Sequence, residues 1–296
     1  MKYAAGIDIG GTNTRVAIVD EHYRIIRKEV FATFVEDLYQ NNEEIRRILS
    51  SFPEEITGVG VSCPGPLDLQ NGVVLTPPNL KAWHYFPLSK SLGQLLQLPV
   101  ILENDANLAC LAESVIGAGK DSSIVQFLTI STGIGSGLCI NNNIYRGAHG
   151  FAHEIANMIL WNNGPQCGTL KKGSIESIAS GTAITTRAKA AGLQVDHAGE
   201  VNDLAIAGNS LAREIMDDAF EYLANGIAAI FAVTDPDVIV LSGSVALKIE
   251  GFIEHLEQLV KTKVYDDLAQ YVCLRRAELG EDCGFIGAAY LAFHQK

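Results

Sequence analysis

Short apolar runs alternate along this chain with segments whose apolar residues recur at helical spacing. The runs at 3–9 and 13–19 flank a tight turn and are predicted to pair as strands. The segments follow one order, strands, helix, strand, helix, and this order occurs twice. The other predicted strands lie at 57–62, 99–102, 123–130, 136–140, 237–242 and near 271–276, and the predicted helices at 41–51, 105–114, 182–191, 201–208, 210–233, 244–264 and 284–294.

This order indicates an α/β protein with two lobes, because helices that alternate with buried strands cover the faces of sheets. Gly117 and Gly119 follow the helix at 105–114 and place a boundary near 115–120. We expect an N-terminal lobe over 1–117 and a C-terminal lobe over 118–296, with the last helix, about 284–294, a candidate for returning to the N-terminal lobe. The halves echo each other, since each opens with a strand, a glycine turn and a second strand.

Three glycine-bearing turns come directly after strongly apolar strands. We expect the two glycines of the first turn to adopt positive φ and to approach a ligand closely, so that turn amides and Thr12 donate to phosphate oxygens. A tight structural turn explains any one of them, but the three together favour a bound nucleotide. Asp8, at a buried strand end, requires a cation or a hydrogen-bond network. The turns are Gly10-Gly11-Thr12, Ser131 to Gly137, and Ser242-Gly243-Ser244.

Composition narrows the class of protein. The chain has 296 residues, of which 48% are hydrophobic, enough for sizeable cores. No stretch approaches the ~18 uninterrupted apolar residues of a membrane span, and no signal-peptide pattern is present, so we expect a cytoplasmic protein. The six cysteines form no CxxC pair, a pattern typical of reduced cytosolic thiols.

The formal net charge of −12 argues against binding of nucleic acid or of an anionic membrane, because no run rich in Lys and Arg offsets it. The same charge constrains the nucleotide hypothesis. A polyanionic ligand must be held by oriented amides, helix ends and a divalent cation rather than by bulk charge.

Six segments in order along the chain carry a resemblance to a known family. They are DIGGTNTR at 8–15, TPPNLKAW at 76–83, LENDANLACLAE at 102–113, TISTGIGSG at 129–137, VIVLSGSV at 238–245 and GFIGAA at 284–289. Together they resemble the sugar-kinase branch of the actin-like ATPase superfamily, specifically the ROK family (repressors, open reading frames and kinases). The resemblance implies a two-lobed α/β fold of the actin-like, or ribonuclease-H-like, type with a ligand cleft between the lobes.

The resemblance also implies ATP-dependent phosphorylation of a hexose hydroxyl by a glucokinase-type enzyme, at the 6-hydroxyl of a glucose-like aldohexose. Phosphoryl transfer needs a base for the hydroxyl proton, and the family's motif assigns that role to Asp105. An aspartate after a short strand is also a common helix cap. The residues implied to bind the sugar are Gly65, Asn79, Asn104, Asp105, Glu154, Asn157 and Glu176.

Magnesium and ATP are the implied cofactors, with Asp8 as the magnesium partner through a water molecule. Arg15 could reach a phosphate or could be an exposed strand arginine. Glu154 and Glu176 could be solvated acids, although their positions beside glycines favour binding. The residues implied to bind the nucleotide are Asp8, Gly10, Gly11, Thr12, Asn13, Arg15, Thr132, Gly133, Gly135, Gly243 and Ser244.

The sequence departs from the family at its structural zinc site, which one histidine and three cysteines form. Asn157 stands where that histidine would be, and Cys167 is the single cysteine left in the matching run. One thiolate without a suitable imidazole cannot make a four-ligand site, and His149 and His153 do not restore the spacing. We expect no zinc, so the loop at 161–173 must be held by packing and hydrogen bonds or be mobile.

The sequence leaves the sugar, the phosphoryl donor and other functions open. N-acetylmannosamine, fructose or a phosphorylated glucoside could be the sugar, and the donor could differ from ATP. A sugar-sensing regulator is disfavoured by the charge and by the start of the first strand at residue 3, and an actin-like filament protein would not need the polar set around Asp105. The resemblance implies a homodimer, although no interface is evident in the sequence.

Overall fold

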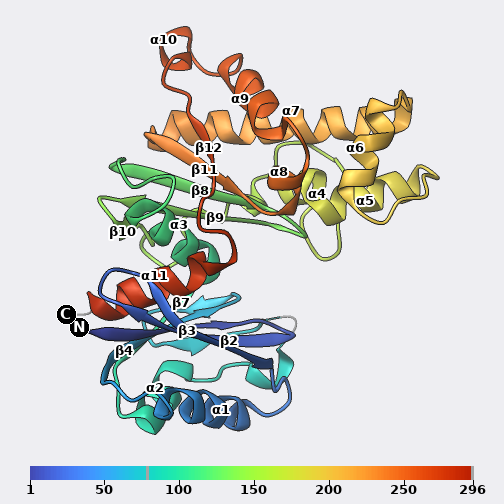
Figure 1. Ribbon diagram of the computed structural model, residues 1–296. Helices are drawn as coiled ribbons and strands as arrows, with labels where there is room; N and C mark the ends of the chain where they lie inside the picture. The colour runs from blue at the N-terminus through green and yellow to red at the C-terminus, as the bar shows by residue number, and fades with distance from the viewer. Residues whose placement is uncertain (78–79, 295–296) are drawn as a thin grey trace. The chain divides into compact units, whose positions relative to one another are not determined.

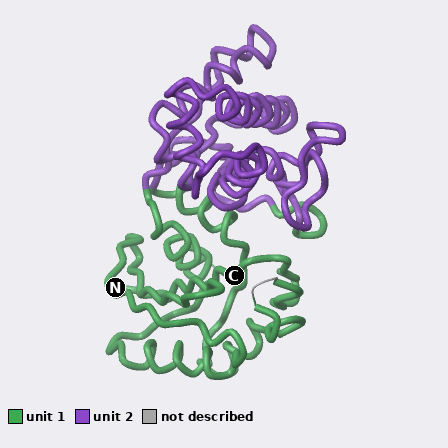
Figure 2. The backbone as a smooth tube through the Cα atoms, turned by 90° about the vertical axis from the view of Figure 1, so that its right-hand side faces the viewer, with its two compact units in different colours: residues 1–116, 146–150, 279–296 green, residues 117–145, 151–278 purple. Residues whose placement is uncertain are grey.

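The computed structural model describes residues 1–77 and 80–294, and it divides into two compact units that Figure 2 shows in different colours. Unit 1 comprises Met1–Ile116, Arg146–Gly150 and Leu279–Lys296, and unit 2 comprises Gly117–Tyr145 and Phe151–Glu278. Segment 146–150, which we expected in the C-terminal lobe, groups with unit 1, and so does the segment with the last helix, our candidate for returning to the N-terminal lobe.

Unit 1 is built on a five-stranded sheet with the order β3-β2-β1-β4-β7. β1 pairs antiparallel with β2 and parallel with β4, and β4 pairs parallel with β7. The strands are β1 (Tyr3–Ile9), β2 (Asn13–Asp20), β3 (Ile25–Ala32), β4 (Ile56–Cys63) and β7 (Val100–Asn104), and a small hairpin is formed by β5 (Leu67–Asp68) and β6 (Val73–Val74). The helices are α1 (Leu38–Ser50), α2 (Leu88–Leu96), α3 (Asp105–Val115) and α11 (Cys283–Phe293), with short 3₁₀ turns at Lys81–Trp83 and Gly280–Asp282.

The period-two alternation of the strands divides their side chains between two faces. Ile7 and Ile9 of β1 join Val16 and Ile18 of β2 in a core with the apolar residues of α1 and α2. Ala4 of β1 and the intervening residues of β2 meet α11 on the other face. Figure 1 shows this layering, with α1 and α2 on one side of the sheet and α11 on the other.

The face beneath α11 carries glycines and small side chains, and at the glycines the helix and sheet backbones come very close. An added Cβ would lie 2.3 Å from the Phe285 carbonyl oxygen at Gly6 and 2.0 Å from the Ala288 oxygen at Gly60. On the helix, a Cβ at Gly287 would lie 2.1 Å from the Leu108 oxygen of α3. Glycine is therefore required at these three positions, since any side chain would displace α11.

Unit 2 repeats the same sheet plan. Its order is β10-β9-β8-β11-β12, with β8 antiparallel to β9 and parallel to β11. The strands are β8 (Ile124–Ile130), β9 (Ile134–Ile140), β10 (Asn143–Ile144), β11 (Val238–Ser242) and β12 (Leu274–Arg276). The internal echo predicted from the sequence thus extends to strand order and direction.

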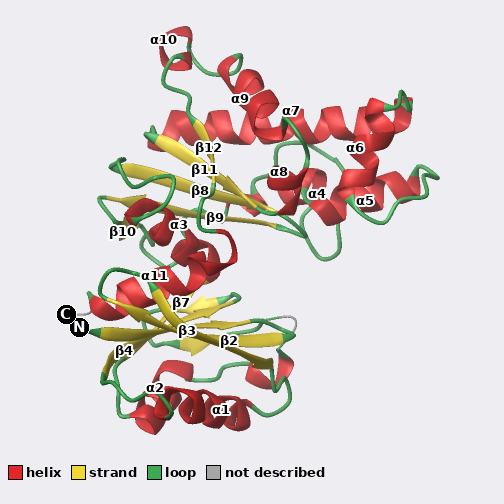
Figure 3. Ribbon diagram, in the orientation of Figure 1, coloured by secondary structure: helices red, strands yellow, loops and turns green. Residues whose placement is uncertain are grey.

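Helices cover one face of this second sheet (Figure 3). Leu128 and Ile130 of β8 and Ile239 and Leu241 of β11 form one core with the apolar faces of these helices, the longest of which is α7. The helices of unit 2 are α4 (Ile175–Ala179), α5 (Gly181–Ala190), α6 (Ala198–Ile206), α7 (Ser210–Thr234), α8 (Ser244–Lys248), α9 (Phe252–Lys261) and α10 (Asp266–Ala269), and a 3₁₀ turn spans Ile155–Asn157.

The structure corrects the sequence-based prediction in two respects. The single helix predicted at 244–264 is two helices, because Gly251 adopts φ +69° and caps a new helix after α8 has ended. The pattern also missed β3 and α2. In β3 the residues at every second position are half-buried rather than fully buried, so its apolar signal is weak.

No helix in the described part of the chain combines the length and the apolar character that crossing a membrane requires.

Gly60→Ala tests the close approach of α11. We expect it to lower the free energy of unfolding by about 3 kcal/mol, because the new methyl group would overlap the Ala288 carbonyl. Gly58→Ala is the control on the same strand, where the nearest atom to a new Cβ is the Ala292 oxygen at 3.3 Å, and we expect a change below about 1 kcal/mol. Urea unfolding followed by circular dichroism measures both, and equal effects would contradict the packing.

Candidate active site

The first glycine turn of unit 1 joins β1 to β2 and is held by hydrogen bonds to both backbone groups of Gly10. The Gly10 amide donates to the Asn13 carbonyl at 2.9 Å, and the Thr33 hydroxyl donates to the Gly10 carbonyl at 2.7 Å. Our expectation of positive φ at Gly10 and Gly11 is wrong, since neither residue has it. Glycine is favoured at position 10 for another reason, because a Cβ there would crowd the Asn13 oxygen at 3.1 Å.

Asp8 lies near the end of β1 with a side chain 26% exposed, and it pairs with Arg15 across the turn. Arg15 Nη1 is 3.1 Å from Asp8 Oδ2, and the two residues face each other in the β1–β2 register. Arg15 therefore forms an ion pair with Asp8 in this structure rather than projecting from the strand without a partner.

Asn104 and Asp105 lie at the junction between β7 and α3. Asn104 is the N-cap, and its Oδ1 accepts from the amides of Ala106 at 2.9 Å and Asn107 at 3.3 Å. Asp105 is the first helical residue and is exposed, and its Oδ1 accepts from the Ala106 amide at 2.9 Å. The capping role thus falls to Asn104, which leaves the outer part of the Asp105 carboxylate accessible.

The pKa of Asp105 is raised above its ordinary value of 3.8. The largest cause is desolvation by surrounding protein atoms, although the side chain itself reaches solvent, and the negative charge of Asp8 adds to it. Burial and the charges of Asp105 and Asp8 also raise the pKa of the Cys63 thiol at the end of β4. Unit 1 therefore brings the two aspartates close together.

Gly65 joins this group from the loop after β4. A Cβ built on Gly65 would lie 3.9 Å from Asn104 Nδ2, so its backbone adjoins the capping residue. Asn79, the remaining predicted sugar residue of the N-terminal half, lies outside the described residues.

In unit 2 the second and third glycine turns lie side by side. The Ser131 hydroxyl is 3.2 Å from the Ser244 hydroxyl, and the Ser131 carbonyl accepts from the Gly181 amide at 2.7 Å. Gly243 has φ +89°, and a Cβ on it would lie 2.3 Å from the Ile130 carbonyl oxygen. Thr132, Gly133 and Ser244 thus belong to one cluster of turns, with Thr132 and Ser244 exposed.

Glu176 reaches this cluster from the first turn of α4. Its Oε2 accepts from the Ile134 amide at 2.7 Å, and a Cβ on Gly133 would lie 3.0 Å from the same oxygen. Desolvation raises the pKa of Glu176, while the bond from Ile134 opposes that shift. The residue predicted to bind sugar therefore also adjoins the predicted phosphate turn.

Glu154 precedes the 3₁₀ turn before α4 and Asn157 is the last residue of that turn, and both are exposed. The Ile175 amide donates to the Met158 carbonyl at 2.9 Å, which places Asn157 and Glu176 one residue from either end of the same hydrogen bond. The three predicted sugar residues of unit 2 thus lie in two adjacent segments.

The loop at 161–173 is held by its own hydrogen bonds and by an aromatic stack. The Gly173 amide donates to the Pro165 carbonyl at 2.8 Å, and the Cys167 amide donates to the Ser177 hydroxyl at 3.2 Å. The Trp161 and Tyr222 rings are parallel, with centroids 5.0 Å apart. Among the described residues no three His, Cys, Asp or Glu side chains gather as a metal site would need, and the absence of zinc stays a prediction.

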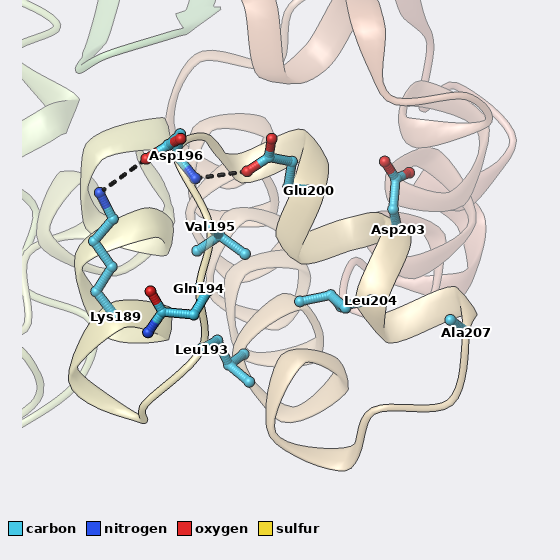
Figure 4. A pocket seen from close by; sticks show the side chains of 9 residues that line it. All are labelled: Lys189, Leu193, Gln194, Val195, Asp196, Glu200, Asp203, Leu204 and Ala207. Atoms are coloured by element: carbon cyan, nitrogen blue, oxygen red, sulfur yellow. Dashed lines mark hydrogen bonds and ion pairs between the residues drawn. The ribbon is translucent and has the colours of Figure 1, made fainter.

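An open groove between α5 and α6 lies apart from all of these residues (Figure 4). Three of its polar side chains have partners, since Lys189 Nζ lies 3.5 Å from Asp196 Oδ1 and the Glu200 carboxylate accepts from the Asp196 backbone amide at 2.6 Å. None of the described residues predicted to bind nucleotide or sugar lines it.

Two polar residues in these groups were given no individual role from the sequence. Ser131 links the second and third glycine turns, and Glu103 hydrogen-bonds to the amide of Asn104. For Glu103 the signal was present, because a charged residue inside a short apolar strand is expensive without partners.

Two sheets of identical order, each with a glycine turn after its first strand, define the class of protein as an actin-like ATPase fold. A model of the ROK family matches residues 4–295, and the chain belongs to this family.

Relatives that are about 30% identical over nearly the whole chain include named sugar kinases. The glucokinase of Thermotoga maritima is 30% identical over 96% of this chain and 95% of its own. The N-acetylmannosamine kinase of Escherichia coli O157:H7 is 32% identical over 98% of each chain.

Solved structures agree with these relatives. The ROK hexokinase from Thermus thermophilus has a TM-score of 0.90 and 32% identity, with 98% of each chain covered. A ROK family glucokinase from Streptomyces griseus, in complex with glucose and AMPPNP, has a TM-score of 0.77 and 28% identity over 98% of this chain and 99% of its own.

The effect of the Asp8 charge on the pKa of Asp105 can be measured in the ligand-free protein. We expect the Asp105 carboxyl to titrate above 3.8, and Asp8→Asn to move its midpoint downward, because one of the charges that disfavour ionisation is gone. Carboxyl ¹³C NMR across the acid range measures both. Glu21→Gln, at an exposed turn, is the control and should leave the midpoint unchanged. A wild-type midpoint at or below 3.8 would contradict the arrangement.

Metal removal tests the zinc prediction. We expect treatment with a strong chelator to leave the melting temperature unchanged, and metal analysis of the purified protein to find far less than one zinc per chain. Trp161→Ala should instead destabilise the protein by about 1–3 kcal/mol, because the stack with Tyr222 supports the loop. A lower melting temperature after chelation, restored by zinc, would contradict the prediction.

Proposed function

We propose that this sugar kinase transfers the γ-phosphoryl group of ATP to the 6-hydroxyl of a glucose-like aldohexose, with Asp105 as the general base. The observation that carries the proposal is the junction of β7 and α3, where Asn104 takes the cap and leaves the Asp105 carboxylate accessible beside Asp8. The sugar-kinase class rests on relatives that match nearly the whole chain.

Asp105 would accept the proton of the attacking hydroxyl as its oxygen bonds to phosphorus. A carboxylate with a raised pKa is a stronger base than an ordinary aspartate. Because the base must be ionised, kcat/KM is expected to fall as the pH drops through that raised pKa.

The glycine turns would bind the phosphate oxygens and the nucleoside. Thr12 and Asn13 are exposed in the first turn, and Thr132 is exposed in the second. Gly243 and Ser244 follow β11 and open α8, a position suited to the adenosine end of ATP. These roles agree with the AMPPNP named in the structure of the Streptomyces griseus glucokinase.

Kinases of this kind use ATP with a divalent metal, and the donor set of unit 1 fits magnesium. Asp8 and Asp105 offer hard carboxylate oxygens close enough for one to raise the pKa of the other. Asp8 would hold the magnesium ion through water, and the bound ion would supply positive charge to neutralise the phosphoryl oxygens. Arg15 would hold the Asp8 carboxylate in place.

The sugar would bind through Gly65, Asn104, Asp105, Glu154, Asn157 and Glu176, which supply backbone, amide and carboxylate groups for its hydroxyls. Glucose is favoured by the named glucokinases and hexokinase, and N-acetylmannosamine is the second candidate because a kinase of that name is equally similar. Pairing of two chains stays a prediction.

Asp105→Asn tests the base. We expect kcat to fall by at least about 1000-fold, because the amide keeps the shape but cannot accept the proton. The rate is measured by coupled ADP release over a panel of hexoses and N-acetylhexosamines with magnesium and ATP. Asp121→Asn, an exposed position, is the matched control and should keep full activity.

Two outcomes would sink the proposal. A wild-type protein silent on every sugar of the panel would remove the function. An Asp105→Asn variant with near-wild-type turnover would keep the function but remove Asp105 from the role of base.

A further inference from the structure

Glu103 is a buried acid to which the proposed chemistry gives no role. Its side chain is 1% exposed, and it lies at the end of β7 two residues before Asp105. Burying a carboxylate costs several kcal/mol unless charge and hydrogen bonds compensate it, so its retention needs a reason.

Both oxygens of the Glu103 carboxylate have partners. Arg146 Nε donates to Oε2 at 2.6 Å, and Asn107 Nδ2 donates to Oε1 at 2.9 Å. The backbone amide of Asn104 also donates to Oε1, at 3.0 Å. The carboxylate is therefore tied to the turn before α3, to the first turn of α3 and to a cation from a distant segment.

These bonds determine how the turn is oriented. Glu103 fixes the peptide group between residues 103 and 104, and Asn104 in turn caps α3 by accepting from two amides. Asp105 follows directly, with its own Oδ1 on the Ala106 amide. A change in the tilt of that one peptide group would swing the Asp105 carboxylate, since the cap and the base are consecutive residues.

Arg146 supplies the compensating charge from the segment 146–150, which groups with unit 1 although its neighbours on both sides belong to unit 2. The Arg146 side chain is 39% exposed, so it ties its segment to the buried Glu103 carboxylate from the protein surface. The guanidinium donates through a directional N–H, which a lysine ammonium would not reproduce.

We propose that Glu103 and Arg146 are a positioning pair that orients the turn between β7 and α3 and thereby aims the Asp105 carboxylate at the sugar hydroxyl. The inference rests on the proposed function. This positioning role differs from a purely structural one, because the effect of the pair on the reaction rate must depend on Asp105.

Glu103→Gln keeps the shape of the side chain but turns an amide toward Arg146 and removes the charge. We expect kcat to fall about 10- to 100-fold, while the KM for the sugar changes less than about 3-fold, because small misplacement of a reacting group costs rate rather than binding. Arg146→Met should act in the same direction, and as a partly exposed position it remains testable if Glu103→Gln does not fold. Arg146→Lys should restore only part of the rate.

Glu113→Gln is the matched control. Glu113 is an equally buried acid on α3 that accepts from the Leu279 amide at 3.0 Å, away from the turn at residue 104. We expect it to lower the melting temperature while leaving kcat within about 2-fold at a temperature well below the transition.

A second background separates positioning from general damage. Combined with Asp105→Asn, Glu103→Gln should leave the residual single-turnover rate unchanged, because nothing remains to be aimed. Full additivity of the two losses would overturn the inference, as would an active wild type with an equally active Glu103→Gln variant. A wild type inactive on every sugar would overturn the proposed function and this inference with it.

Discussion

The parallel register of β1, β4 and β7 is the constraint on which the unit 1 site depends. Asp8 pairs with Ser62, Ser62 pairs with Glu103, and Cys63 pairs with Asn104. Because parallel strands end at the same edge of a sheet, the residues that follow them collect there without any long-range side-chain contact. The first aspartate, the loop with Gly65 and the start of α3 come from distant parts of the sequence, and the sheet alone brings them together.

Unit 2 applies the same rule to different residues. Ser242 at the end of β11 pairs with Thr129 of β8, so the turns that follow these strands are neighbours. The glycine at 243 is required by its positive φ and by the Ile130 carbonyl, whereas the one at 10 is only favoured, by crowding against the Asn13 oxygen. The same sheet topology therefore supports two kinds of glycine turn. The sequence pattern of an apolar strand followed by a glycine turn is common to both and does not distinguish them.

The apolar runs predicted most strands and long helices because their signal is local. They did not predict the break after α8, where one glycine decides between a continuous helix and two helices. They also could not predict that Glu176 adjoins Gly133, or that Arg146 neutralises Glu103, because both pairs join residues more than 40 positions apart. The residue types in the turns were enough to predict their chemistry. The partners of the charged groups could be identified only from the folded structure.

The placement of α11 has a consequence for synthesis. The glycine face of β1 and β4 is made from the first 63 residues of the chain, yet the helix that covers it begins at Cys283. A ribosome must therefore translate more than 200 further residues, as far as α11, before this face of the first sheet can be covered. Until then the nascent chain carries an uncovered backbone surface, and a chain truncated before Cys283 would leave that surface uncovered.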